Sequence, residues 1–115
     1  MSKGGLDEGQ LYEEALNRWG HPAQQDMMVE EMAELTVALA KHRRMPCFDR
    51  LKYVCEEIAD VEIMLMQLKI MLEIEPGYFN MFKEKKLERL AERMGVEFNG
   101  RYIMQSDYFQ RRTFQ

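Results

Sequence analysis

A chain of 115 residues fits one domain and buries only about two-thirds of the surface that its unfolded form exposes, so a second subunit would add to its stability. Apolar residues make up 46% of the chain and charged residues 31%, a composition that excludes a disordered protein. The net charge of −4 gives no sign of the clustered basic surface that binds a DNA or RNA backbone, so we expect no nucleic-acid partner.

The sequence carries no signal for a membrane or for secretion. Gln67 and Lys69 interrupt the apolar run 63–66, which falls far short of the roughly 20 apolar residues that cross a bilayer. The N-terminal residues lack the apolar centre of a signal peptide, so we expect a cytoplasmic protein with no membrane partner. Cys47 and Cys55 form no CxxC motif and have no His at metal-binding spacing, which indicates reduced, structural thiols.

Glycine and proline divide the chain into four predicted helices, because both residues interrupt regular helix. The predicted helices cover about residues 6–19, 22–44, 49–75 and 76–94. Gly20 and Pro46 separate the first three helices, and Asp49 is the expected N-cap of the third. Pro76 opens the fourth helix and Gly95 is its expected C-cap. The pattern predicts an all-α fold.

The segment after the fourth helix differs in kind. Asn99-Gly100, a dipeptide preferred in two-residue hairpin turns, lies between the apolar-rich segments 96–98 and 101–103. These residues predict a short C-terminal β-hairpin. An isolated hairpin is marginally stable in water, so the tail, residues 96–115, is expected to lie on the helical domain, residues 1–95, or on a neighbouring subunit.

Two acidic clusters, one on the second helix and one on the third, are the most informative motifs. They read Glu30-Glu31-x-x-Glu34 and Glu56-Glu57-x-x-Asp60. Acids at positions i and i+3 of a helix point the same way, about 60° apart around its axis. On a helical wheel Glu31 and Glu34 share a sector with Met27, and Glu57 and Asp60 share one with Met64. Both helices are therefore expected to direct carboxylates inward.

Four inward carboxylates require protonation or a cation, because burying unpaired charge is costly. Hard oxygen ligands without soft donors suit Mg²⁺ or Mn²⁺. Zinc is disfavoured because neither cluster contains His or Cys. A di-iron bundle relies on Glu-x-x-His pairs, and no Glu stands three residues before His21 or His42.

Taken together, the clusters read Glu-Glu-x-x-Glu and Glu-x-x-Asp separated by residues 35–56, a pattern that resembles the MazG-like nucleoside triphosphate pyrophosphohydrolases. Trp19-Gly20 followed by Gln24, and the phrase Glu-Glu-Ile-Ala-Asp-Val at 56–61, also look like family sequence. The resemblance covers about residues 11–94. Glu62 departs from the pattern, since relatives usually have an apolar residue there.

The resemblance implies a four-helix MazG-like bundle, a homodimer or homotetramer, whose catalytic domain spans residues 1–95. It implies that the chain cleaves an NTP or dNTP between the α and β phosphates, giving a nucleoside monophosphate and pyrophosphate. The implied Mg²⁺ ligands are Glu31, Glu34, Glu57 and Asp60. Glu30 lies next to them, and either Glu30 or Glu34 is the candidate general base.

Further residues are assigned to the substrate by the same resemblance. Lys86 and Arg89 on the fourth helix match a Lys-x-x-Arg spacing that faces phosphate, although Glu84 stands where an Asn often occurs, and Asn80 with Lys83 offers another register. For the base, Trp19 would stack and Gln24 would hydrogen-bond an edge. The basic residues 41–44 either approach phosphates or stabilise a helix C-terminus, and we favour the second interpretation.

The main alternative is a non-catalytic helical oligomerisation or interaction module, in which the carboxylates hold a structural cation or form ion pairs. Basic partners for such pairs are scarce, since only Lys41 and Arg50, near the helix ends, share the inward sectors. A further alternative is a related enzyme that specialises in dUTP or dCTP, or a phosphohydrolase of another acidic helical family.

Overall fold

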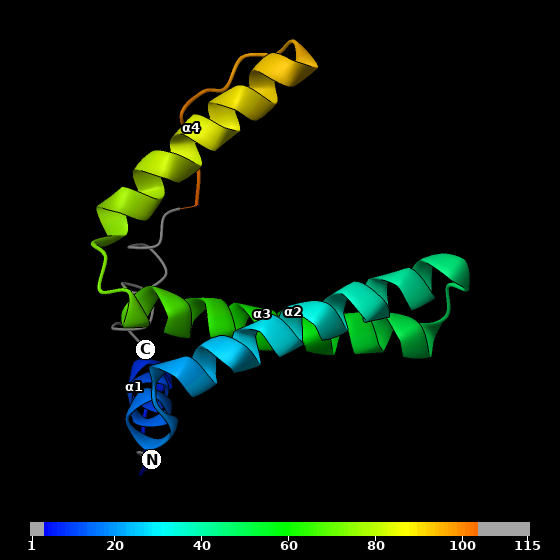
Figure 1. The fold of residues 1–115 in the computed structure, drawn as a ribbon. Helices are drawn as coiled ribbons and strands as arrows, with labels where there is room; N and C mark the ends of the chain where they lie inside the picture. Colours follow the sequence, from blue (N-terminus) through cyan, green and yellow to red (C-terminus); the bar gives the residue numbers. More distant parts are fainter. Residues whose placement is uncertain (1–3, 104–115) are drawn as a thin grey trace. The chain divides into compact units, whose positions relative to one another are not determined.

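The computed structural model describes residues 4–103 (Figure 1). The element order is α1 (Glu8–Trp19), α2 (His21–Arg44), α3 (Phe48–Met71) and α4 (Pro76–Met94). The described residues contain no strand, so the predicted all-α fold is confirmed for this range. Within it, no helix has the length and hydropathy needed to cross a membrane.

The first helix boundary depends on local side-chain chemistry. The Asp7 carboxylate accepts a hydrogen bond from the Gln10 backbone N–H at 2.8 Å, and the Gln10 side chain accepts one from the Asp7 N–H at 3.0 Å. This capping box starts α1 at Glu8. Gly20, with a φ of 87°, ends α1 and is also the N-cap of α2, a conformation that glycine adopts without steric cost.

The third helix differs from its prediction at both ends. It starts at Phe48 with Cys47 at the N-cap rather than Asp49, and it ends at Met71 rather than near residue 75. Glu73 adopts a φ of 52°, a left-handed conformation that cannot continue the helix. The fourth helix ends at Gly95 in the left-handed conformation, as predicted.

The helices α1, α2 and α3 belong to one compact unit, Met1–Glu73, and α4 belongs to a second, Ile74–Gln115. In the first unit α2 and α3 pack side by side and α1 contacts both. The apolar core of this unit consists of Tyr12, Leu16, Met28, Ala38, Val54, Met64 and Met71. Three polar residues, Gln24, Glu57 and Gln67, are buried with them.

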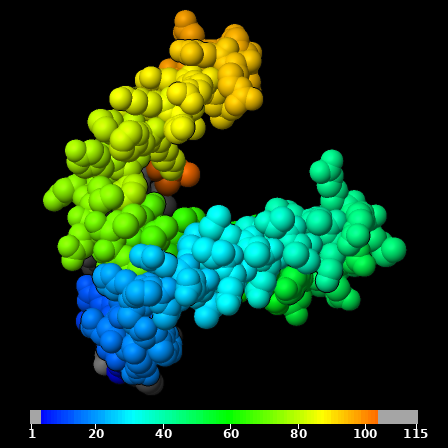
Figure 2. Space-filling model, viewed as in Figure 1, coloured from blue at the N-terminus to red at the C-terminus, as the bar shows by residue number. Residues whose placement is uncertain are grey.

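Much of the α2–α3 pair carries exposed apolar side chains. In the space-filling view α1, in blue, lies against the end of the pair where α2 begins (Figure 2). Elsewhere Val29, Met32 and Leu39 are 67%, 51% and 51% exposed. Apolar side chains that stay exposed along a helix are typical of a face that meets another protein surface.

The predicted β-hairpin does not form in the described part of the tail, residues 96–103. The Asn99 side chain accepts a hydrogen bond from the Arg101 backbone N–H at 2.9 Å, and Lys83 Nζ donates to the Ile103 carbonyl at 2.7 Å. Side chains therefore form hydrogen bonds with backbone groups that would otherwise pair the two strands of a hairpin. The rest of the predicted tail, residues 104–115, lies outside the described residues.

Candidate metal centre

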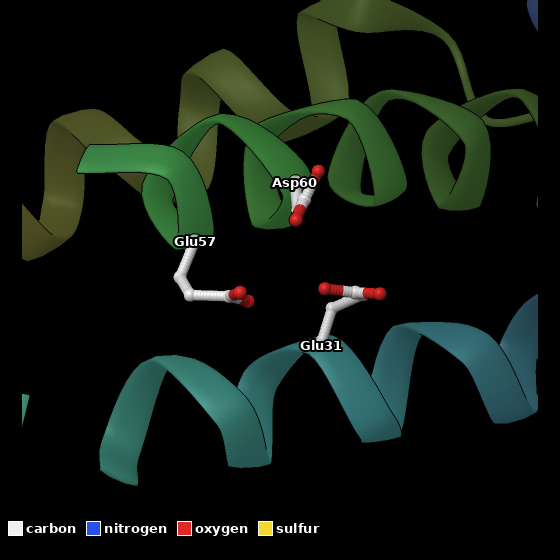
Figure 3. Close-up of side chains that lie close together, drawn as sticks. All are labelled: Glu31, Glu57 and Asp60. Atoms are coloured by element: carbon white, nitrogen blue, oxygen red, sulfur yellow. The ribbon is translucent and has the colours of Figure 1, made fainter. Parts of the chain in front are cut away.

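Three carboxylates from two helices meet between α2 and α3 (Figure 3). Glu31 comes from α2, and Glu57 and Asp60 come from α3; one oxygen of each lies within 4.8 Å of the others. The i, i+3 spacing places Glu57 and Asp60 on one side of α3, and the packing of α2 against α3 brings Glu31 opposite them. The predicted inward orientation is confirmed for these three residues.

Two oxygens of this group are buried without a hydrogen-bond partner among the described residues. They are Glu31 Oε2 and Glu57 Oε2. Glu57 is only 5% exposed, whereas Asp60 is the most open of the three to solvent. Orphaned buried oxygens are rare in proteins and indicate a missing partner. An all-carboxylate set of this kind fits a hard divalent cation such as Mg²⁺.

The electrostatics agree with a missing cation. Burial raises the pKa of Glu31 from 4.5 to about 7, and the charges of Glu34, Asp60 and Glu57 add to this effect. Burial also raises the pKa of Glu57, followed by repulsion from Glu34 and Asp60. None of the three carboxylates forms an ion pair with a Lys or Arg of residues 4–103.

Glu34 and Glu30 lie at the edge of this group. Both are exposed on α2, and neither is one of the three residues whose oxygens converge. The charge of Glu34 nevertheless raises the pKa of both Glu31 and Glu57, so its carboxylate is near theirs. The structure therefore brings together three of the four predicted inward carboxylates, and Glu34 stays exposed beside them.

An apolar cavity of about 470 Å³ lies at the end of the α2–α3 pair that α1 covers. Its lining is Ala15, Trp19, Ala23, Gln24, Met27, Met64 and Gln67. Met27 precedes Glu31 by one helical turn, and Met64 follows Asp60 by one turn. The cavity therefore begins about 6 Å along the helices from the carboxylates.

Two residues predicted to contact a base line this cavity. Trp19 is 61% exposed, so it is available for stacking and is not a core residue. Gln24 is buried, and its Nε2 donates to Gln67 Oε1 at 2.6 Å. Gln67 in turn donates to Met64 Sδ at 3.8 Å. These bonds hold the Gln24 amide in place on the cavity wall.

No protein-family model, curated protein or solved structure matches this chain. Its function is therefore inferred from the site itself.

The predicted phosphate ligands Lys86 and Arg89 lie on α4, in the second compact unit. Both side chains are exposed. The alternative register is less available, because Lys83 donates to the Ile103 carbonyl.

Two residues of the site were not predicted as functional. Tyr53 precedes Glu57 by one turn of α3, and the charge of Glu57 is the main cause of its raised pKa, with a side-chain hydrogen bond contributing. The four-residue spacing of Tyr53 and Glu57, which places both on one side of the helix, can be seen in the sequence. Gln67 gave no such signal, because its partner Gln24 is distant in sequence and the pairing depends on tertiary packing.

Proposed function

We propose that the chain is a Mg²⁺-dependent nucleoside triphosphate pyrophosphohydrolase of the MazG-like type. The observation that supports this most directly is the group Glu31, Glu57 and Asp60, with two orphaned buried oxygens, one turn from an apolar cavity lined by Trp19 and Gln24. A cation site beside a cavity of this size suits a ligand with one anionic and one aromatic end.

Glu31, Glu57 and Asp60 would hold the cation, with Glu34 completing the set from the solvent side. When bound, Mg²⁺ or Mn²⁺ would neutralise phosphate charge and orient the scissile bond. The side chains of Trp19 and Gln24 would bind the base in the cavity, and the family resemblance assigns phosphate contacts to Lys86 and Arg89. A water oxygen attacks the α phosphorus, the bond to the bridging oxygen breaks, and pyrophosphate leaves.

The finer architecture belongs to the same proposal. We infer a four-helix MazG-like bundle, assembled as a homodimer or homotetramer, because the exposed apolar faces of α2 and α3 match what a second copy would cover.

The decisive experiment incubates the purified protein with canonical and damaged NTPs and dNTPs, including dUTP and dCTP, with and without Mg²⁺, and measures pyrophosphate and nucleoside monophosphate. Mg²⁺-dependent release of both products supports the proposal. Mg²⁺ binding without turnover of any nucleotide would refute it and favour the interaction module with a structural cation.

The water proton requires a carboxylate base, and Glu30 and Glu34 are the candidates beside the cluster. Replacement of the base by Gln is expected to lower kcat about 100-fold or more, because proton abstraction in the transition state is lost. We expect this loss in Glu34→Gln or in Glu30→Gln. Glu30→Gln is expected to retain Mg²⁺ affinity, whereas Glu34→Gln also removes a proposed ligand and is expected to weaken it. Steady-state kinetics and calorimetry measure the two properties. Full turnover in both variants would exclude both residues as the base.

Stacking on Trp19 predicts a separate effect on substrate affinity. Trp19→Ala is expected to raise KM roughly tenfold with a smaller change in kcat, because stacking on an aromatic ring contributes about 1–3 kcal/mol per base. Trp19→Phe keeps an aromatic face and is expected to stay near the wild-type KM. Steady-state kinetics of the two variants checks this. Equal KM values for the Ala variant and the wild type would exclude Trp19 from the base site.

A further inference from the structure

A second cavity, of about 340 Å³, lies where α2 ends and α3 begins. Its lining is Ala38, Lys41, Arg44, Asp49, Arg50 and Tyr53. Three cationic side chains against one carboxylate give this basic cavity a net positive lining. Its composition is the opposite of the apolar cavity at the other end of the helix pair and suits an anion.

The basic cavity is next to the carboxylate group. Tyr53 lines it and also interacts with Glu57, which follows one helical turn later. Four residues correspond to about 6 Å along the helix, the same spacing that separates Asp60 from Met64 in the apolar cavity. The α2–α3 pair therefore presents an apolar cavity, a carboxylate group and a basic cavity in a line.

The structure also fixes part of the basic cavity. Arg50 Nη1 donates to the Lys41 carbonyl at 2.7 Å, so this side chain crosses from α3 to the last turn of α2. The side chains of Lys41 and Arg44 do not bridge the two helices in this way. Within the described residues, no side chain caps the N-terminus of α3. The first-turn amides of α3 thus add positive potential at the same end.

We propose that the basic cavity binds the β and γ phosphates of the substrate and then the pyrophosphate product. The identity of the ligand rests on the proposed function. With the base in the apolar cavity, the α phosphate lies at the carboxylates and the remaining phosphates extend toward Lys41 and Arg44. When the water oxygen bonds to the α phosphorus, the electron pair of the broken bond goes to the pyrophosphate oxygen. The cationic side chains of Lys41 and Arg44 bind the negative charge that develops on that oxygen.

This placement departs from the expectation that residues 41–44 only stabilise the end of a helix. It also removes the need for α4 in binding the terminal phosphates, because the cations of the first compact unit suffice. The two assignments predict different variants to be defective, so one experiment separates them.

The test is calorimetric titration of inorganic pyrophosphate into the full chain in the presence of Mg²⁺. Lys41→Gln and Arg44→Gln are each expected to weaken binding about tenfold or more, since each loses a charge-assisted contact. Arg44→Lys is expected to retain most of the affinity. Arg43→Gln is the matched control, because Arg43 lies on the same last turn of α2 but does not line the cavity. It loses the same charge and should bind like the wild type.

Several outcomes would overturn the inference. These are no pyrophosphate binding by the folded wild type, equal weakening by Arg43→Gln and Arg44→Gln, or weakening only in Lys86→Gln and Arg89→Gln. Because the titration needs no turnover, the two proposals fail separately. Cavity-dependent pyrophosphate binding without hydrolysis of any nucleotide contradicts the enzyme alone, and hydrolysis with cavity-independent binding contradicts this inference alone.

Discussion

Glu57→Gln is expected to reduce pyrophosphate release by at least roughly 100-fold and to weaken Mg²⁺ binding strongly, since it removes the most buried of the three convergent carboxylates. The same change is expected to raise the melting temperature of the metal-free protein at pH 8 by a few degrees. A neutral amide would replace a buried charge that repels Glu34 and Asp60. Loss of function with gain of stability is the opposite of what damage to the fold produces.

Glu56→Gln supplies the control for this experiment. Glu56 is the neighbouring residue on α3, and its side chain is exposed. Its replacement removes the same charge from the same helix but leaves the carboxylate group intact, so activity and Mg²⁺ affinity should stay near those of the wild type. Comparable losses in the two variants would show that general charge, and not the buried site, governs activity.

The stability of the metal-free protein is expected to fall as pH rises from about 4.5 to about 7. The reason is that folding raises the pKa of Glu31 from 4.5 to about 7. In that window the folded chain retains a proton that the unfolded chain has released, so raising the pH favours unfolding. The effect is complete above pH 7. Thermal unfolding in EDTA at pH 5 and pH 8 measures it, and a difference of several degrees is expected.

Two comparisons isolate the carboxylate group as the cause. Mg²⁺ is expected to restore stability at pH 8 and to have little effect at pH 5, because a ligand stabilises the state that binds it and protonation competes with binding. Glu31→Gln is expected to flatten the pH dependence in EDTA, whereas Glu30→Gln should keep it. A pH dependence that is unchanged in Glu31→Gln would locate its origin elsewhere.

The sequence was sufficient for the helices and for the convergence of acids, because both follow from short-range spacing. The i, i+3 pairs defined which side of α2 and α3 carries carboxylates, and packing of the two helices did the rest. The predicted end of α3 was wrong because the residue type of Glu73 does not indicate the left-handed conformation that it adopts. The hairpin predicted within residues 96–103 does not form, because the side chains of Asn99 and Lys83 form hydrogen bonds with backbone groups that the hairpin would use.

Features that depend on distant residues could not be predicted. The Gln24–Gln67 hydrogen bond joins two helices, and each glutamine alone reads as an ordinary polar residue. The basic cavity requires Arg44 from one helix and Arg50 from the next to line one space, which depends on the geometry of the connection. Helical periodicity gives the direction of a side chain but not its partner across an interface.

The position of Glu57 also bears on attempts to engineer this chain for heat resistance. It occupies a buried site where an apolar side chain of similar volume would pack without an unsatisfied oxygen, and such replacements at buried charges are often neutral or stabilising. A screen that rewards heat resistance alone would therefore favour removal of the acids on which the proposed chemistry depends. These positions should be held constant in any such library, and mutations should be directed to the exposed faces of the helices.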